Sequence, residues 1–329
     1  MSQAKPEPDA SSQPTERDAL DRLFQRSQRL RQTEHYRAFL DFIGRLSNYS
    51  PFNGAILHVQ RPGGMYFATQ SQWKERFGRH VKANARPCVI LQPFGPILFV
   101  FAAEDTLPAE DGTPLPEQIT DPFAVDGTLD LTMWHKTYKR CEEEERVKVQ
   151  FDPTLSKGRA GFIASNGPRF AVSSGYTHVI TLRGPNTTKP RGADSSSDVT
   201  AAEQYATFAH EMAHLFCGHL GASKTDWWPD RRTLSLAQRE IEAESVAYLV
   251  CRRAGLHSLS ERYLHTHVQR VKTRSSGTSS QASSEKNQPS QDASEQNVLP
   301  PIGLEAVLKA VKYVEDMGKA GFESKRDAE

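Results

Sequence analysis

The chain has 329 residues, of which 37% are hydrophobic and 25% charged, and its net charge is +1. This length allows one or two domains with a buried core. No stretch reaches the roughly 18 apolar residues that cross a bilayer, and the polar first residues lack the apolar core of a signal peptide. We therefore expect a cytoplasmic protein without a membrane partner.

The four cysteines are widely separated and form no C-x-x-C pair. This spacing argues against a disulfide framework and favours buried free thiols in a reducing compartment. The sequence is therefore not typical of a small disulfide-rich secreted protein.

Charge is unevenly distributed along the chain. Residues 16–90 contain 13 Lys or Arg against 6 Asp or Glu, whereas residues 103–145 contain 12 acidic against 3 basic residues. A basic segment can neutralise the phosphates of a nucleic acid, and an acidic run is often a solvated region. The front of the chain is thus the candidate for contact with nucleic acid.

The first half is predicted to hold a small α+β domain at 16–103. Large apolar residues recur at helical spacing through 16–47, and a second short helix is expected at 52–60, directly after a proline. Residues 88–92 and 97–102 are predicted to form two strands joined by a tight turn rich in Pro and Gly.

The second half is predicted to be mainly helical, with a small sheet. Thr200 with Glu203, and Ser235 with Gln238, form the capping box that opens a helix. A last helix is expected at 304–317. The fold class that follows is α+β.

The amino-acid composition of each segment predicts where the domains and the disordered segments begin and end. Segments rich in Ser, Pro and Gln cannot bury enough apolar surface to offset the entropy of ordering them. The predicted parts are a disordered tail at 1–15, the front domain at 16–103, an acidic connecting region at 104–159, a C-terminal domain at 160–270, a disordered Ser/Gln-rich linker at 271–301, and a C-terminal helix and tail at 302–329.

The pattern that indicates chemistry is H-E-x-x-H, formed by residues 210–214 inside the helix that follows Thr200. Residues four apart share a helical face, so the imidazoles of His210 and His214 can bind one cation. Zinc in such a site polarises a carbonyl and activates a water molecule, while the adjacent carboxylate of Glu211 moves the proton. The five-residue pattern also occurs by chance, but its place in an amphipathic helix favours a zinc site.

A catalytic zinc usually has three protein ligands. In the next helix, Glu240 and Glu244 share a stripe of small residues, where two carboxylates are costly to bury without a cation. Glu240 is the predicted third ligand, and Glu244 is the predicted hydrogen-bond partner of a ligand histidine. Glu242 is expected to lie in solvent, and His219 is out of phase with His214. The alternative is that all three acids form a surface charge run.

Two features near this pattern allow two interpretations each. The adjacent Trp227 and Trp228 either line an active-site cleft or cover the pair of helices as core residues. The strand around His178 is either the edge strand on which a peptide substrate aligns or an ordinary sheet position.

The segment H-E-M-A-H, followed by E-I-E-A-E-S-V-A at 240–247, resembles the ImmA/IrrE-type metallopeptidases. In that family a glutamate in an E-x-x-A segment of the next helix completes the zinc site, and Glu240 and Ala243 match this segment. The resemblance implies a zincin-like zinc metallopeptidase domain that acts on a protein or peptide substrate.

The order N-Y-S-P-F-N at 48–53, Q-R-P at 60–62, Q-W at 72–73 and G-R-H-V-K at 78–82 resembles the N-terminal domain of ArdC-type antirestriction proteins. Members of that family join a single-stranded-DNA-binding domain to a zinc metallopeptidase domain. Basic side chains neutralise phosphates and aromatic ones stack on unpaired bases. The candidate DNA-binding residues are Tyr49, Arg61, Trp73, Lys74, Arg79 and Lys82.

The sequence thus supports two main functions. The first is a zinc-dependent metallopeptidase coupled to a domain that binds single-stranded DNA. The alternative is a single-stranded-DNA-binding, antirestriction-type protein in which zinc is only structural. Glu211 favours the enzyme, because a structural zinc site has no use for that carboxylate. A protein-interaction scaffold built on the acidic and Ser-rich segments is a third hypothesis.

Overall fold

The structure, a computed structural model, contains helices and small sheets, so the α+β class is confirmed. The predicted tail at 1–15 and most of the predicted linker lie outside the described residues. Among the residues that the structure describes, no helix combines the length and apolar character needed to cross a bilayer. The described residues are 33–92, 95, 97–108, 115, 127–156, 160–166, 173–184, 199–223, 226–256 and 299–321.

The front of the chain begins with α2 (Thr33–Arg45) and α3 (Pro51–Gln60). Proline suits the first turn of α3, where a backbone N–H has no helical partner, and the Ser50 hydroxyl accepts a hydrogen bond from the Asn53 N–H. The expected second helix is therefore confirmed.

Short antiparallel strands follow these helices. The two strands predicted around the Pro-Gly turn are confirmed as β3 (Cys88–Ile90) and β4 (Leu98–Ala102), which pair with each other. One three-stranded sheet has the order β1-β4-β3, and β2 pairs with β5 beside it. The elements are β1 (Phe67–Ala68), α4 (Gln70–Phe77), β2 (Arg79–Val81), β3 (Cys88–Ile90), β4 (Leu98–Ala102), the 3-10 helix η2 (Ala103–Asp105) and β5 (Thr106–Pro108).

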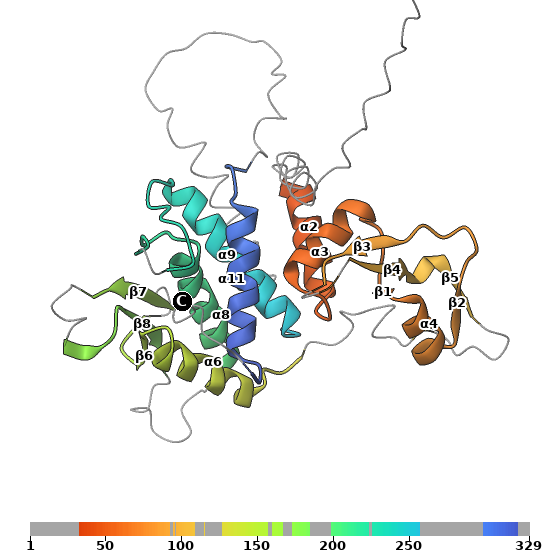
Figure 1. Cartoon of the computed structure of the whole chain (residues 1–329). Helices are drawn as coiled ribbons and strands as arrows, with labels where there is room; N and C mark the ends of the chain where they lie inside the picture. The colour runs from red at the N-terminus through yellow and green to blue at the C-terminus, as the bar shows by residue number, and fades with distance from the viewer. Residues whose placement is uncertain are drawn as a thin grey trace, which may run out of the picture.

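The C-terminal half is built on α8 (Ala201–Phe216) and α9 (Leu236–Arg253), which pack against each other. Both predicted capping boxes are present, so the rotational phase of each helix relative to its start follows from local sequence. The helix α11 (Leu304–Met317) lies against both, and α6 (Leu131–Glu143) contacts α11 (Figure 1).

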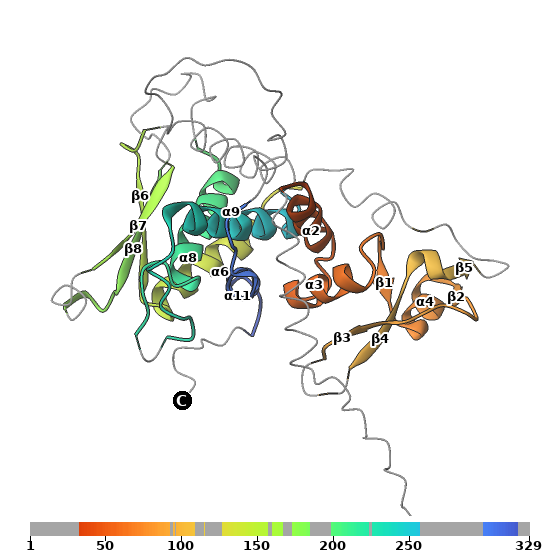
Figure 2. The same cartoon turned by 90° about the horizontal axis from the view of Figure 1, so that it is seen from above.

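A second three-stranded sheet lies beside these helices. Its order is β6 (Val147–Asp152), β8 (His178–Arg183) and β7 (Gly161–Ser165), with β8 parallel to β6 and antiparallel to β7. Figure 2 shows this sheet on one side of α8, α9 and α11, and the front strands on the other side, beyond α2 and α3.

The hydrophobic core crosses the predicted domain boundaries. Tyr36, Leu40 and Ile43 of α2 belong to the same buried cluster as the inner faces of α8, α9 and α11. Leu299, which lies inside the segment predicted as a linker, is also buried in this cluster, so the linker prediction is wrong at its last residues. The helix α11 is therefore part of the core and not a separate C-terminal element.

Arg253, at the end of α9, connects this core to the segment that contains α2 and the turn after it. Its guanidinium donates hydrogen bonds to the carbonyl oxygens of Ile43, Leu46 and Tyr49 at 3.1, 2.9 and 2.7 Å, and it pairs with Glu315 of α11. The side chain is only 3% exposed. Carbonyl groups at the end of α2 and in the turn that follows it thus gain a charged donor, in addition to the backbone N–H bonds that the Ile43 and Leu46 carbonyls already accept.

We expect Arg253→Met to destabilise the fold by about 3–5 kcal/mol, because it leaves the largely buried Glu315 carboxylate without its arginine and removes the charged donor from three backbone carbonyls. Urea unfolding measures this loss. Arg86→Met, which removes an exposed arginine of the front segment, is the matched control and should leave the midpoint unchanged. Equal midpoints for the two variants would show that Arg253 does not connect the two halves.

Candidate metal centre

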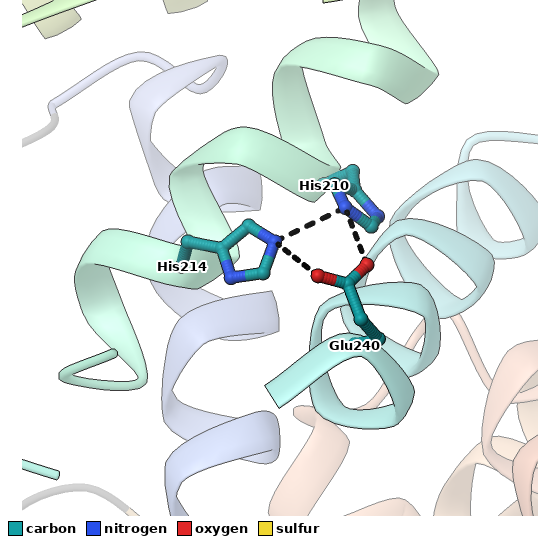
Figure 3. Close-up of side chains that lie close together, drawn as sticks. All are labelled: His210, His214 and Glu240. Atoms are coloured by element: carbon teal, nitrogen blue, oxygen red, sulfur yellow. Dashed lines mark hydrogen bonds and ion pairs between the residues drawn. The ribbon is translucent and has the colours of Figure 1, made fainter. Parts of the chain in front are cut away.

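The imidazoles of His210 and His214 meet on one face of α8. Their Nε2 atoms lie 3.2 Å apart (Figure 3). Two nitrogen ligands at roughly 2.0–2.1 Å from a tetrahedral zinc lie about 3.3 Å apart, so this separation fits a shared cation. The opposite face of α8 is apolar and buried, which fixes the direction in which the imidazoles point.

Glu240 reaches the same point from α9. One carboxylate oxygen lies 3.7 Å from the His210 Nε2 and the other lies 3.7 Å from the His214 Nε2 (Figure 3). The donor atoms of the three residues all lie within 4.8 Å of one another, so they can hold a metal ion. The Glu240 side chain is 30% exposed against 14% for each histidine, so the group is open to solvent on the α9 side.

Glu244 lies one turn further along α9, behind the first histidine. Its Oε1 is 3.5 Å from the His210 Nδ1, and its side chain is almost completely buried. A carboxylate at this place favours a proton on Nδ1 and leaves the Nε2 lone pair facing the cation site.

His214 is held in its neutral form. Burial, together with the neighbouring His210, His219 and Arg239, lowers the pKa of His214 to about 2. The neutral imidazole is the form that binds metals.

Glu211 lies beside the three donors, and its orientation is set by the sheet. Its Oε2 accepts a hydrogen bond from the backbone N–H of Ile163 in β7 at 3.0 Å. Burial raises the pKa of Glu211, and the carboxylates of Glu240 and Glu244 add to this rise, while His210 and the Ile163 N–H oppose it. A carboxylate with a raised pKa is a stronger base than one in water.

The expectation that Glu242 lies in solvent is wrong, because its side chain is fully buried. Its carboxylate accepts two hydrogen bonds from Arg231, at 2.7 and 2.6 Å, one from the Gly303 N–H at 2.7 Å, and one from the His219 Nε2 at 3.0 Å. Burial alone would raise the pKa of Glu242, but these donors lower it below the usual value. The loop after α8 and the start of α11 cover this face of α9, which helical phase alone could not indicate.

Cys217, His219 and Glu242 also lie within 4.8 Å of one another. They are a poor metal site, because the guanidinium of Arg231 already binds both oxygens of Glu242. Burial raises the pKa of the Cys217 thiol, so this side chain is a neutral thiol in the metal-free protein.

The two tryptophans of the loop between α8 and α9 belong to the core. The Trp227 ring packs on Phe216 and Tyr313, with ring centroids 5.3 and 4.9 Å apart, and Trp228 is buried with its Nε1 donating to the Gly221 carbonyl. They therefore cover the helix pair, which was one of their two interpretations.

The hypothesis that the strand around His178 is an edge strand is wrong. That strand is β8, which lies between β6 and β7. Sequence alone does not give the order of strands in a sheet. Among the strands that the structure describes, the edge strand next to Glu211 is β7, which the sequence analysis did not identify.

The interpretation of Trp73 as a base-stacking residue is wrong. The indole is fully buried in the front domain, and its Nε1 donates to the Phe101 carbonyl at 2.9 Å. Arg61 forms an ion pair with Asp105, with both nitrogen–oxygen distances at 2.8 Å, so its charge is balanced within the fold. In a small domain, aromatic residues also form the core and basic residues also form internal ion pairs. The pattern of basic and aromatic residues therefore did not identify a DNA-binding surface here.

The other candidate DNA-binding residues have varied surroundings. The Tyr49 hydroxyl donates to the Phe67 carbonyl at 2.8 Å, and the Arg79 guanidinium donates to Thr106. The side chains of Lys74 and Lys82 are exposed, although the Lys82 Nζ also donates to the Glu104 carbonyl.

No family model, curated protein or solved structure matches this chain. The candidate metal centre therefore rests on its own residues and distances. The main evidence for this centre is that two helices, each begun by a capping box, bring three possible metal donors to one point.

Gly218 makes the turn that leads from α8 to His219. Its φ is +76°, in the left-handed region, and an added Cβ would lie 1.8 Å from the Pro229 carbonyl oxygen. A residue with a side chain is strained in this conformation by roughly 1–2 kcal/mol, before any contact is considered.

We expect Gly218→Ala to destabilise the protein by more than this conformational strain, because the Pro229 backbone must also move. Urea unfolding of two control variants separates the effects. Gly175→Ala has a similar φ, +77°, with open space around the new Cβ, and Gly63→Ala adds a methyl group in open space. If Gly218→Ala costs no more than Gly175→Ala, the close approach of Pro229 has no energetic weight.

Proposed function

We propose that this protein is a zinc-dependent metallopeptidase with a zincin-like catalytic domain. His210, His214 and Glu240 hold the metal, Glu211 is the general base, and Glu244 orients His210. The observation that carries the proposal is the convergence of two Nε2 atoms and one carboxylate within 4.8 Å, with a fourth side chain, Glu211, beside them but outside the donor set.

The donors and the base have separate chemical roles. Zinc held by two imidazoles and a carboxylate acts as a Lewis acid that polarises a carbonyl and makes a water molecule more acidic. Glu211 takes the proton from the attacking water and gives it to the nitrogen of the departing amine. The Ile163 N–H fixes Oε2, so Oε1 is the oxygen that handles the proton.

A peptide substrate is supported by the edge of β7. The Arg183 N–H donates to the Ala160 carbonyl, and the Asn166 N–H donates to the Thr177 carbonyl, each at 2.8 Å. Because backbone groups alternate in direction along an antiparallel pair, those of Ile163 point away from β8. The Ile163 N–H is already used by Glu211, so an extended peptide would pair with the Ile163 carbonyl and with the outward-facing backbone groups of Gly161 and Ser165, beside Glu211.

Glu211→Gln should keep zinc and reduce hydrolysis by roughly 10²–10⁴-fold, the usual contribution of a general base. Zinc content is measured by atomic spectroscopy, and cleavage of a mixture of denatured proteins is measured by mass spectrometry of new termini. His210→Ala and Glu240→Ala, which remove donors, should lose both zinc and cleavage.

Two results would contradict the enzyme. Loss of zinc from Glu211→Gln as complete as from His210→Ala would make Glu211 a structural residue. A wild-type protein that holds zinc but shows the same cleavage as Glu211→Gln would favour the alternative, in which the metal only stabilises the C-terminal half.

We propose single-stranded DNA binding by the front segment as a second function, which keeps Lys74 and Lys82 from the first expectation and adds Phe99 and Arg76. Phe99 of β4 is 51% exposed, which is unusual for an aromatic side chain in a small sheet. Lys74, Arg76 and Lys82 of the same segment are exposed as well. Exposed aromatic rings combined with basic side chains are typical of surfaces that bind unpaired strands.

Fluorescence anisotropy with a labelled oligothymidine tests this second function. Affinity should fall as salt rises, with a slope of about 0.7 for each phosphate neutralised, and Phe99→Ala should cost roughly 1–3 kcal/mol of binding free energy. Leu131→Ala, which trims an exposed apolar side chain of α6, is the control and should bind like the wild type. Absence of binding at low salt would remove the DNA proposal and leave the metal centre untouched.

A further inference from the structure

A line of buried polar contacts begins on the side of His214 that faces away from the three metal donors. The His214 Nδ1 lies 3.0 Å from the His219 Nδ1, and the His219 Nε2 lies 3.0 Å from a carboxylate oxygen of Glu242. The side chains of His219 and Glu242 are both completely buried. Bulk water therefore does not reach these groups, and their hydrogen bonds must be made within the protein.

The direction of each hydrogen bond follows from the two ends of this line. Glu242 accepts from the Arg231 guanidinium and from the Gly303 N–H, so it presents oxygen lone pairs to His219. The His219 Nε2 must then carry a proton. In the proposed site the His214 Nε2 binds the metal and carries no proton. The proton of the 3.0 Å contact is then on the His214 Nδ1, so the His219 Nδ1 has none.

A His219 Nδ1 without a proton can only accept a hydrogen bond. The 3.0 Å contact requires one donor, and the His214 Nδ1–H is that donor. In that tautomer the His214 Nε2 carries a lone pair, and this atom is the one that faces His210 and Glu240.

We propose that His219 and Glu242 are positioning residues that hold His214 in its Nδ1–H tautomer and thereby prepare it to bind the metal. This inference rests on the proposed function, because it assigns His214 as a ligand. It also makes the start of α11, through the Gly303 N–H, part of the support of the metal centre, although Gly303 lies 61 residues after Glu242.

The packing around Gly303 supports the role of α11. A Cβ on this residue would lie 2.3 Å from a guanidinium nitrogen of Arg231. A side chain at position 303 would therefore displace the Arg231 guanidinium from the carboxylate that both groups bind. Arg231 also donates to the Cys217 carbonyl at 3.2 Å, so the loop that carries His219 is tied to the same point.

The tautomer of His214 is measured in metal-free full-length protein by long-range ¹H–¹⁵N correlation of the imidazole rings, with His214→Gln used to assign the signals. The wild type should show His214 as the Nδ1–H tautomer. His219→Phe, which keeps a ring but removes the acceptor, should shift His214 towards the Nε2–H tautomer that is favoured in water. His219→Asn places an acceptor oxygen near the position of Nδ1 and should restore the wild-type signal.

Zinc affinity, measured by competition with a chromophoric chelator, gives the second readout. His219→Phe should weaken binding about 10–100-fold, the usual effect of losing the partner of a ligand histidine, and His219→Asn should recover most of this loss. Tyr313→Phe is the control for general destabilisation, since it removes a buried 2.6 Å hydrogen bond to Glu145 outside this line of contacts. It should leave zinc affinity unchanged.

Three results would overturn the inference. One is a wild-type His214 in the Nε2–H tautomer. Another is an unchanged His214 tautomer in His219→Phe. The third is an equal loss of zinc affinity in His219→Phe and Tyr313→Phe, which would indicate a merely structural role. If the wild type binds no zinc, the proposed function fails, and the tautomer measurement still decides whether His219 sets the state of His214.

Discussion

The buried ion pair between Glu242 and Arg231 is the interaction on which the architecture around the metal centre depends. A carboxylate without partners is too costly to bury, and Glu242 is buried because Arg231, His219 and the Gly303 N–H all donate to it. His219 and Arg231 lie in the loop between α8 and α9, and Gly303 directly precedes α11. One charge thus fixes both ends of this loop and the start of α11 against α9, and the line of contacts ends at His214.

Arg253 has a similar role at the other end of α9, where it donates to the Ile43 carbonyl of α2 and the Leu46 carbonyl just after it, and pairs with Glu315 of α11. The helix α9 is therefore held at both ends by arginine contacts, and its middle carries Glu240 and Glu244 towards α8. Because α2 packs into the same core as α8 and α9, the basic front segment is joined to the candidate centre by a continuous hydrophobic cluster. In the proposed enzyme, the DNA-binding and hydrolytic parts would form one body.

Local sequence patterns predicted much of this structure. The wrong predictions concern residues whose positions depend on contacts between segments far apart in the sequence. Two capping boxes fixed the phases of α8 and α9, so the meeting of the histidines with Glu240 followed from spacing alone. Glu242 was misjudged because its partners, Arg231 and Gly303, lie 11 and 61 residues away and no pattern links them to it. Trp73 was misjudged because composition cannot separate a core aromatic from an exposed one. The role of β7 was missed because strand order is set by packing.

The central claim is that His210, His214 and Glu240 bind one zinc ion with Glu211 beside it. Anomalous diffraction above and below the zinc absorption edge, from crystals grown with zinc, tests this claim directly. We predict one strong anomalous peak at about 2 Å from the His210 Nε2, the His214 Nε2 and a carboxylate oxygen of Glu240, with Glu211 outside bonding distance. A peak on Cys217, His219 and Glu242, or no peak between the two histidines, would contradict the account.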